Sequence, residues 1–192
     1  FDKKAPTFRH KQYADYKAGR KKMPDELAQQ LQPLKDLLDK FNINRLELEG
    51  YEADDLIGTV AKLGEENDFK VYIVTGDKDA IQLASHKTTT LITKKGVGEV
   101  EEYNYDSVLE RYEMTPTQFI DLKGLMGDKS DNIPGVPGVG EKTGIKLLKQ
   151  YSTIENLIEH TDELKGSIKK KIEENKDLAL MSKQLATIIT NV

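Results

Sequence analysis

The first half of the chain alternates short apolar runs with amphipathic stretches. Lys70–Val74 is a β-branched run typical of a buried parallel strand, and Ala53–Glu66 carries apolar residues at helical spacing. Alternating apolar and polar side chains at Arg45–Glu49 predict another strand. Two further extended segments, Leu83–Ile92 and Gly98–Glu102, are expected around a Lys-Lys-Gly turn. This half therefore has the pattern of an α/β fold with a mostly parallel sheet.

From Ser107 onward the pattern is mostly helical, and it ends in a short extended segment at Thr187–Thr190. The predicted helices are Ser107–Tyr112, Thr115–Met126 with Pro116 at its first position, Glu141–Gln150, Ile154–His160 and Lys165–Lys183. Strands alternating with helices and then followed by helices alone predict an α/β core with an attached helical subdomain. We assign residues 1–106 and 186–192 to the core and residues 107–185 to the subdomain.

Residues 24–40 form a helical pattern of their own. Pro24 and the two acidic residues after it are suited to the first turn of a helix. Leucines recur at positions 27, 31, 34, 37 and 38, and we expect them to pack in the core. Pro33 interrupts the pattern and should kink or divide the helix.

Composition narrows the class of protein. The chain has 192 residues, of which 37% are hydrophobic and 32% charged, which suits a single domain with a core. No apolar run approaches the roughly 18 residues of a membrane span. The absence of cysteine excludes disulfides and zinc–thiolate sites. Phe1-Asp2 has the character of a strand end, so we expect further chain ahead of Phe1.

Four acidic clusters fall at predicted strand ends or helix starts. They are Asp2; Glu52, Asp54 and Asp55; Asp77 and Asp79; and Asp128 and Asp131. Loops at the carboxyl ends of parallel strands converge on one crevice, where eight carboxylates would repel each other unless cations neutralised them. Oxygen ligands favour Mg²⁺ or Mn²⁺, and His10, His86 and His160 lie outside the clusters, which disfavours zinc. Two such ions can support in-line phosphoryl displacement.

Each acidic cluster alone also has a structural explanation. Asp54, Asp55 or Asp77 could simply cap the helix that follows it. Capping requires one acid per helix, however, and the clusters hold two or three, so their coincidence favours a metal site. The net charge of −4 does not argue against a nucleic-acid partner, because the acids are concentrated and the remaining surface is mildly basic.

A glycine-rich stretch, 135–140, follows the last acidic cluster and precedes a helix that begins at Glu141. Glycines let a backbone approach a ligand closely, and the free N–H groups of a helix start favour a phosphate. Carboxylates suited to a metal therefore lie beside amides suited to a phosphate. This pairing indicates phosphodiester chemistry.

Residues 3–24 are rich in cations and poor in aliphatic side chains. Four of the cations crowd together at Lys17, Arg20, Lys21 and Lys22, and the interleaved aromatic residues are Phe8, Tyr13 and Tyr16. Such a segment can contact a nucleic-acid strand, with cations on phosphates and rings on bases. The alternative is an ordinary solvated loop.

These motifs closely resemble the 5′-nuclease (flap endonuclease) family, in particular the 5′→3′ exonuclease domain of bacterial DNA polymerase I. The matching motifs are EADD at 52–55, TGDKD at 75–79, GDKSDNIPG at 127–135 and GVGEKT at 138–143. APTFRH at 5–10 and YKAGR at 16–20 also fit, so the resemblance covers essentially the whole chain. It implies a PIN-like core, a helical arch at about 3–24 and a helix–three-turn–helix (helix–hairpin–helix) DNA-binding element at 133–150.

The resemblance also implies two or three divalent ions, Mg²⁺ or Mn²⁺. By motif match, the first ion would be bound by Asp2, Glu52 and Asp54, and the second by Asp54, Asp77, Asp79 and Asp131, with Asp55 and Asp128 close by, partly through water. Lys17 and Arg20 match the basic residues that clamp the scissile phosphate. Tyr13 or Tyr16 would stack on the displaced nucleotide.

The implied partner is DNA with a 5′ flap, a nick or a 5′ end, including RNA-primed strands, in replication and repair. The implied DNA contacts are Arg9, Tyr13, Tyr16, Lys21, Lys22, Gly135, Val136, Gly138, Val139, Gly140, Lys142 and Thr143. In some relatives the hairpin binds phosphate through a K⁺ held by backbone carbonyls. The resemblance further implies a monomer associated with the nucleoid in the bacterial cytoplasm, with a polymerase linked after Val192.

One family motif is missing from this sequence. The first strand of the family carries an Asp-Gly motif with a further metal-ligand Asp, and we expect that strand ahead of Phe1. If it were truly absent, a non-catalytic, structure-specific DNA-binding module would be the alternative. A metal-dependent phosphatase of small molecules would explain the carboxylates but neither the glycine-rich hairpin nor the basic segment.

Overall fold

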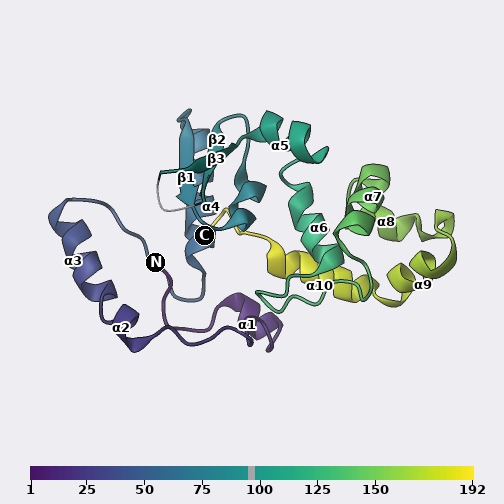
Figure 1. The fold of residues 1–192 in the computed structure, drawn as a ribbon, viewed down its shortest axis with the longest axis horizontal. Coiled ribbons are helices and arrows are strands. Elements are labelled where there is room, and N and C mark those ends of the chain that lie inside the picture. Colours follow the sequence, from purple (N-terminus) through teal and green to yellow (C-terminus); the bar gives the residue numbers. More distant parts are fainter. Residues whose placement is uncertain (95–97) are drawn as a thin grey trace.

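A computed structural model describes residues 1–94 and 98–192 (Figure 1). Its strands are β1 (Val71–Thr75), β2 (Thr88–Thr93) and β3 (Val100–Tyr103). Its α-helices are α1 (Phe8–Gln12), α2 (Asp25–Ala28), α3 (Leu31–Lys40), α4 (Ala53–Glu66), α5 (Tyr105–Tyr112), α6 (Gln118–Met126), α7 (Glu141–Tyr151), α8 (Ile154–Glu159), α9 (Gly166–Glu174) and α10 (Lys176–Ala186). Two 3₁₀ turns, η1 (Lys78–Leu83) and η2 (Thr161–Glu163), complete the list. The α/β class is confirmed, while the predicted Lys-Lys-Gly turn extends into residues outside those described.

The sheet is small and mixed, in the strand order β1-β2-β3. β1 and β2 pair in parallel, whereas β2 and β3 pair antiparallel, so the sheet is not mostly parallel. Helix α4 covers one face, where Ala61 packs with Ile73 of β1. On the other face Tyr72 and Val74 are 63% and 64% exposed. The predicted parallel strand is therefore confirmed, but β1 is buried on only one face.

Arg45–Glu49 does not form the predicted strand. This segment is extended, but it has no ladder of backbone hydrogen bonds to another strand among the described residues. Its carbonyl at Leu46 accepts a hydrogen bond of 2.9 Å from the amine of Phe1, and its Glu47 side chain pairs with Lys35 at 2.6 Å. Alternating polarity indicates a strand only where a partner strand is available.

Thr187–Thr190 is the second predicted strand that does not form. Two of its backbone amides donate to side chains instead of to a neighbouring strand. The amide of Ile188 donates to Gln82 Oε1 at 2.8 Å, and that of Ile189 donates to Asp55 Oδ1 at 2.9 Å. Local sequence pattern does not reveal such long-range side-chain acceptors.

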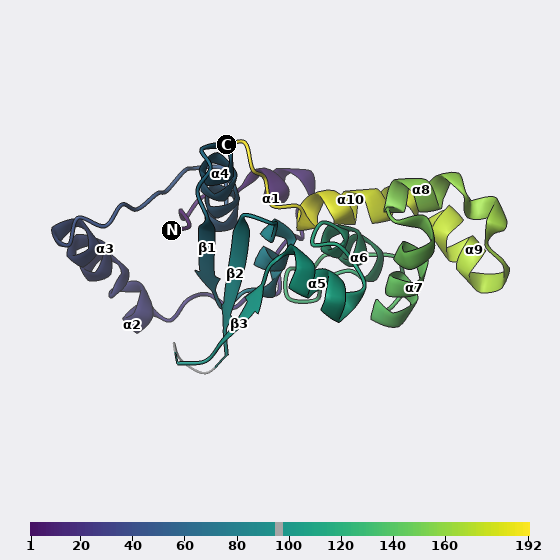
Figure 2. The ribbon, with the colours of Figure 1, turned by 90° about the horizontal axis from the view of Figure 1, so that it is seen from above.

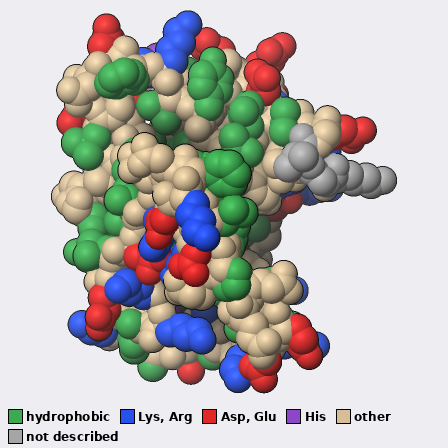
Figure 3. Space-filling model, turned by 90° about the vertical axis from the view of Figure 1, so that its left-hand side faces the viewer, with side chains coloured by type: hydrophobic (Ala, Val, Ile, Leu, Met, Phe, Trp, Pro, Cys, Tyr) green, Lys and Arg blue, Asp and Glu red, His purple; other side chains and the backbone are tan. Residues whose placement is uncertain are grey.

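None of the leucines of residues 24–40 is buried, which contradicts the expectation that they pack in the core. Within α2 and α3, both fully described, no residue is buried, and Leu27, Leu34 and Leu37 are 48%, 43% and 49% exposed. The two helices extend away from the sheet (Figures 1 and 2), and apolar side chains are spread over this face (Figure 3). Periodicity identifies an apolar helix face but not what covers it. The predicted division does occur, and Pro33 lies in the first turn of α3, where proline is tolerated.

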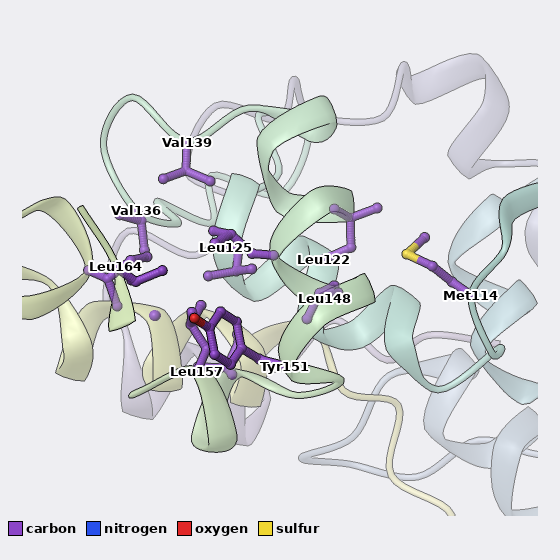
Figure 4. Packing of buried hydrophobic residues seen from close by; sticks show 13 residues of the cluster. Met114, Leu122, Leu125, Val136, Val139, Leu148, Tyr151, Leu157 and Leu164 are labelled. Atoms are coloured by element: carbon purple, nitrogen blue, oxygen red, sulfur yellow. The ribbon is translucent and has the colours of Figure 1, made fainter. Parts of the chain in front are cut away.

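The helical subdomain surrounds one apolar cluster (Figure 4). Leu125 of α6, Leu148 of α7 and Leu157 of α8 are almost completely buried there. Val136 and Val139, from the segment between α6 and α7, complete the cluster. The core thus fixes the start of α7 relative to the other helices.

The predicted single helix over Lys165–Lys183 is divided into α9 and α10. The break falls at Asn175, whose side-chain amide donates to the carbonyl of Lys171 at 2.8 Å. Helix α10 then packs along α6 and leads the chain back toward α4 (Figure 2). Across residues 1–94 and 98–192, no helix has the length and apolarity needed to cross a bilayer.

A buried ion pair joins the N-terminal segment to α4 and to the chain after α10. Arg9 donates to both carboxylate oxygens of Asp55 at 2.8 and 2.7 Å, and both side chains are almost fully buried. Arg9 also donates to the carbonyls of Leu185 and Thr187 at 2.9 and 2.5 Å. Burial opposes both charges, but their mutual hydrogen bonds prevail, lowering the pKa of Asp55 and raising the pKa of Arg9.

Replacing Arg9 with methionine should destabilise the fold, because Asp55 would remain as an unpaired buried carboxylate. We expect the free energy of unfolding in urea at neutral pH to fall by about 3–5 kcal/mol. Lys170→Met is the control, since it removes an exposed pair with Glu174 and should cost less than about 1 kcal/mol. Similar losses in the two variants would contradict the role assigned to the buried pair.

Candidate metal and nucleic-acid sites

Carboxylates from all four acidic clusters meet at one hollow of about 220 Å³, which we call the acidic pocket. The acids that line it are Asp2, Glu52, Asp54, Asp77, Asp79 and Asp131. The predicted catalytic cations Lys17 and Arg20 line the same pocket. Segments far apart in the sequence therefore bring six of the eight candidate ligands together.

Local hydrogen bonds position several of these acids. Glu52 is the N-cap residue of α4, and the amide of Ala53 that begins the helix donates to Asp2 Oδ1 at 2.7 Å. Asp77 caps η1 by accepting from the amide of Asp79 at 2.9 Å. The capping explanation is therefore correct for some of the acids. Glu52 and Asp77 each cap a helix and also line the pocket.

Basic side chains reach into the acidic pocket. Lys17 Nζ lies 2.7 Å from Glu52 Oε1 and 3.7 Å from Asp131 Oδ2, and Arg20 pairs with Asp131. The Tyr16 hydroxyl donates to Glu52 at 3.1 Å and to Asp131 at 3.3 Å. Lys17 is held by its left-handed backbone (φ +56°), whose amide donates to the carbonyl of Asp131 at 2.8 Å. The structure thus places both predicted catalytic cations against the acids.

Lys123 of α6 is a site residue that the sequence analysis missed. Its ammonium pairs with both Asp79 and Asp128, and so links the pocket to the one acid of the last cluster that does not line it. Burial works against ionisation of Asp128, but hydrogen bonds from Lys123 and Ser130 outweigh it and lower its pKa to about 2. A single lysine in a helix carries no local signal of this role.

The donor set suits a hard divalent cation. All six ligands are carboxylates, and burial together with the negative charges of Asp77 and Glu52 raises the pKa of Asp54 to about 6. Among the described residues, no three acidic or histidine side chains form a group that could hold one ion. Lys17, Arg20 and Lys123 pair with acids of the pocket.

Three predicted site residues serve the fold instead. Asp55 is fully buried with both oxygens bound by Arg9, so it does not face the pocket as a metal ligand would. Arg9 itself is 2% exposed, which removes it from the predicted DNA contacts. Tyr16 is 3% exposed and cannot stack on a nucleotide. It belongs to a small apolar cluster with Ile133 and Leu185, and Tyr13 packs half-buried against that cluster.

Some of the predicted DNA contacts in the hairpin at 133–140 are buried, and others are exposed. Val136 and Val139 are buried in the helical core, and the amide of Gly135 donates to Ser182 Oγ at 3.0 Å. The predicted contacts that remain exposed are Lys21, Lys22, Gly138, Gly140, Lys142 and Thr143. Helix α7 begins at Glu141, and the amides of its first turn have no acceptor within the helix, which leaves them available to a phosphate.

Comparison with protein families covers the whole chain. Residues 1–113 match the family described as "5'-3' exonuclease, N-terminal resolvase-like domain", and residues 114–192 match "5'-3' exonuclease, C-terminal SAM fold". The chain belongs to the 5′-3′ exonuclease family. The resemblance noted in the sequence, and with it the prediction of a 5′ nuclease fold, is confirmed.

Individual relatives agree with this assignment. The chain is 57% identical over 192 residues to DNA polymerase I of Bacillus subtilis (strain 168), covering 100% of this chain but only 22% of that protein's length. The structure of T5 5'-exonuclease with bound divalent metal ions (zinc) is 26% identical, with a TM-score of 0.81, over 96% of this chain and 71% of the other. The catalytic core of Rad2 in complex with DNA substrate shares the fold, at 17% identity and a TM-score of 0.57, over 98% and 64% of the two chains.

Replacing Lys123 with methionine should make stability depend on divalent ions, because Asp79 and Asp128 would lose the cation they share. In protein free of divalent ions we expect the melting temperature to fall by about 5 °C. Adding Mn²⁺ should restore most of this loss, since a ligand that binds the folded state stabilises it.

The matched control is Lys183→Met, which removes a cation from Asp121 and Glu155, both outside the pocket. Its melting temperature should also fall, but Mn²⁺ should not restore it. An equal response of both variants to Mn²⁺ would contradict a metal site at Asp79.

Proposed function

We propose that this chain is a structure-specific, divalent-metal-dependent 5′ nuclease that hydrolyses phosphodiesters near junctions of single-stranded and duplex DNA. The observation that carries the proposal is the convergence of six carboxylates with Lys17 and Arg20 on one pocket. Carboxylates can hold cations that activate a phosphodiester, while basic side chains neutralise its oxygens. Membership of the 5′-3′ exonuclease family supports the same reaction.

The acidic pocket would hold two or three ions of Mg²⁺ or Mn²⁺, which suit ligands that are all oxygens. The ligands would be Asp2, Glu52, Asp54, Asp77, Asp79 and Asp131, with Asp128 supporting them through Lys123. Divalent ions bound there would act as Lewis acids on phosphoryl oxygens and lower the pKa of water. The divalent metal ions named for T5 5'-exonuclease support this proposal.

Lys17 and Arg20 would contact the scissile phosphate. In this structure each pairs with a carboxylate of the pocket, Glu52 or Asp131. When these carboxylates bind cations, the two basic side chains are freed to pair with phosphate oxygens. The Arg20 side chain is 50% exposed, so its guanidinium can meet a ligand from solvent. Its planar fork suits two oxygens of one phosphate.

The helical subdomain, residues 107–185, would bind the duplex through the element at 133–150. The first-turn amides of α7 would bind one backbone phosphate. Lys142 and Lys146 lie on that helix without a carboxylate partner among the described residues, so their charges are available to the strand. Lys21 and Lys22, in an arch at about 3–24, would guide the 5′ single strand toward the pocket of the core.

The substrates that fit this arrangement are 5′ flaps, nicks and 5′ ends, including RNA-primed strands. A monomer suffices for it, because one chain supplies both the pocket and the hairpin. Since the chain spans 22% of its DNA polymerase I relative, a covalently linked polymerase after Val192 belongs to the proposal. The proposal also includes action on the nucleoid in the bacterial cytoplasm, because the DNA polymerase I relative is bacterial.

The function is tested with a 5′-labelled flap duplex in the presence and absence of Mg²⁺. We expect Mg²⁺-dependent cleavage near the junction. Tight binding without cleavage would instead favour a non-catalytic DNA-binding module, and hydrolysis of p-nitrophenyl phosphate without DNA cleavage would favour a phosphatase. Either outcome would overturn the proposed nuclease.

In the same assay, Asp131→Asn should reduce cleavage by about a hundredfold or more while flap binding stays within about threefold of the unmodified protein. Asparagine keeps the shape of the side chain but removes the charge that would hold a cation. Asp36→Asn, at an exposed acid of α3 that accepts only from the side-chain amide of Gln32, is the control and should leave both activities unchanged. Equal losses of binding and cleavage in Asp131→Asn would indicate a structural role.

Two glycines of the hairpin should respond differently to alanine. Around Gly140 a Cβ would meet nothing within 4 Å, so Gly140→Ala should fold normally yet weaken duplex binding by about tenfold, because its methyl group obstructs a close backbone approach. At Gly135 a Cβ would lie 2.2 Å from the amide nitrogen of Gly127, so Gly135→Ala should lower the melting temperature instead. Fluorescence anisotropy and thermal melting measure the two effects. Unchanged duplex affinity in Gly140→Ala would contradict a hairpin contact with DNA.

A further inference from the structure

A lysine ammonium lies on the hairpin carbonyl of Gly138. Lys171 Nζ of α9 donates to that carbonyl oxygen at 2.9 Å, across 33 residues of sequence. Gly138 has φ +75°, and a Cβ placed on it would lie 2.6 Å from the same nitrogen. The ammonium therefore covers the face of Gly138 that a side chain would otherwise occupy.

Both sides of this contact are fixed by the helical core. Val139, which follows Gly138, and Ile172, which follows Lys171, are buried in the same apolar cluster. The hairpin and the last turns of α9 are thus held together by packing independent of the ammonium. A long, flexible side chain is confined at its base, so its positive charge is directed to one carbonyl.

Lys171 differs in charge pairing from the other lysines of its helix. Lys169 pairs with Asp162 at 3.2 Å, and Lys170 lies 3.7 Å from Glu174. Lys171 has no carboxylate partner in residues 1–94 and 98–192. Its charge is compensated only by a carbonyl dipole, so it can still pair with an anion.

We propose that Lys171 is the built-in cation of the hairpin, which binds a phosphate of the duplex in place of a monovalent metal ion. A carbonyl oxygen stabilises an ammonium and a K⁺ in the same way, but the Gly138 oxygen already holds the ammonium. The K⁺ expected from the family resemblance is therefore not required by this chain. This inference rests on the proposed role of the hairpin in duplex binding.

The test measures the affinity of catalytically silent protein, in Ca²⁺, for a labelled nicked duplex by fluorescence anisotropy. Lys171→Met, Lys171→Arg and the control Lys170→Met are compared with the unmodified protein. Each is titrated in KCl and in N-methyl-D-glucamine chloride at equal ionic strength, because the organic cation is too bulky for a carbonyl site. Thermal melting of each variant confirms that it is folded.

The unmodified protein should bind equally in the two salts. In the organic salt Lys171→Met should bind about fivefold to thirtyfold more weakly, the value of one charge-assisted contact, while Lys171→Arg should stay within about threefold. Affinity of Lys171→Met equal to that of Lys170→Met would overturn the proposal, as would a loss of affinity by the unmodified protein when K⁺ is withdrawn. Failure of the unmodified protein to bind the duplex in either salt would instead reject the proposed function itself.

Discussion

The acidic pocket depends on a buried ion pair at its edge, where Arg9 lines the pocket and binds Asp55 behind it. Asp55 directly follows the pocket residue Asp54 in the first turn of α4, and one residue of helix turns its side chain toward Arg9. The same carboxylate accepts from the amide of Glu52 at 3.0 Å and from that of Ile189 at 2.9 Å. It therefore fixes the start of α4 against the N-terminal segment and the chain after α10. Such a pair contributes little net stability, but breaking it is costly, so it specifies one arrangement of these three segments.

Charge balance in the pocket follows from that arrangement. The acids come from segments that the fold brings together, and their repulsion is relieved by Lys17, Arg20 and Lys123, which the same fold places among them. The basic side chains thus compensate part of the negative charge that the acids bring together. In the function we propose, cation binding and phosphate binding are linked. When the carboxylates bind cations instead of Lys17 and Arg20, these two basic side chains become available to the phosphate of the substrate.

The sequence predicted those features whose structural cause lies in neighbouring residues, and it did not predict those caused by contacts between distant residues. The bounds of α4 agree with its predicted range, since helical spacing and acidic first-turn residues are both local signals. The predictions of a strand at Arg45–Glu49 and of buried leucines in α3 are wrong. The first required a partner strand and the second a covering surface, and the described chain supplies neither. In the site, clustered acids predicted the pocket, but Arg9 lies 46 residues from its partner Asp55, and Asp79 lies 44 residues from its partner Lys123. Only the folded chain reveals that Asp54 lines the pocket while Asp55 is held in a buried ion pair.

The stretch from Gly127 to Gly135 connects the pocket mechanically to the hairpin. The backbones of Gly127 and Gly135 cross at its two ends. They lie so close that a Cβ on Gly135 would be 2.2 Å from the amide nitrogen of Gly127, and a Cβ on Gly127 would be 2.6 Å from the carbonyl oxygen of Ile133. Inside this crossing Asp128 and Ile133 exchange two backbone hydrogen bonds of 2.9 and 2.8 Å, so the loop that carries Asp131 is closed at its base. The hairpin leaves the same crossing and enters the helical core at once. A phosphate held by the hairpin would therefore stand at a set distance from the pocket, because hydrogen bonds close the loop and core packing holds the hairpin.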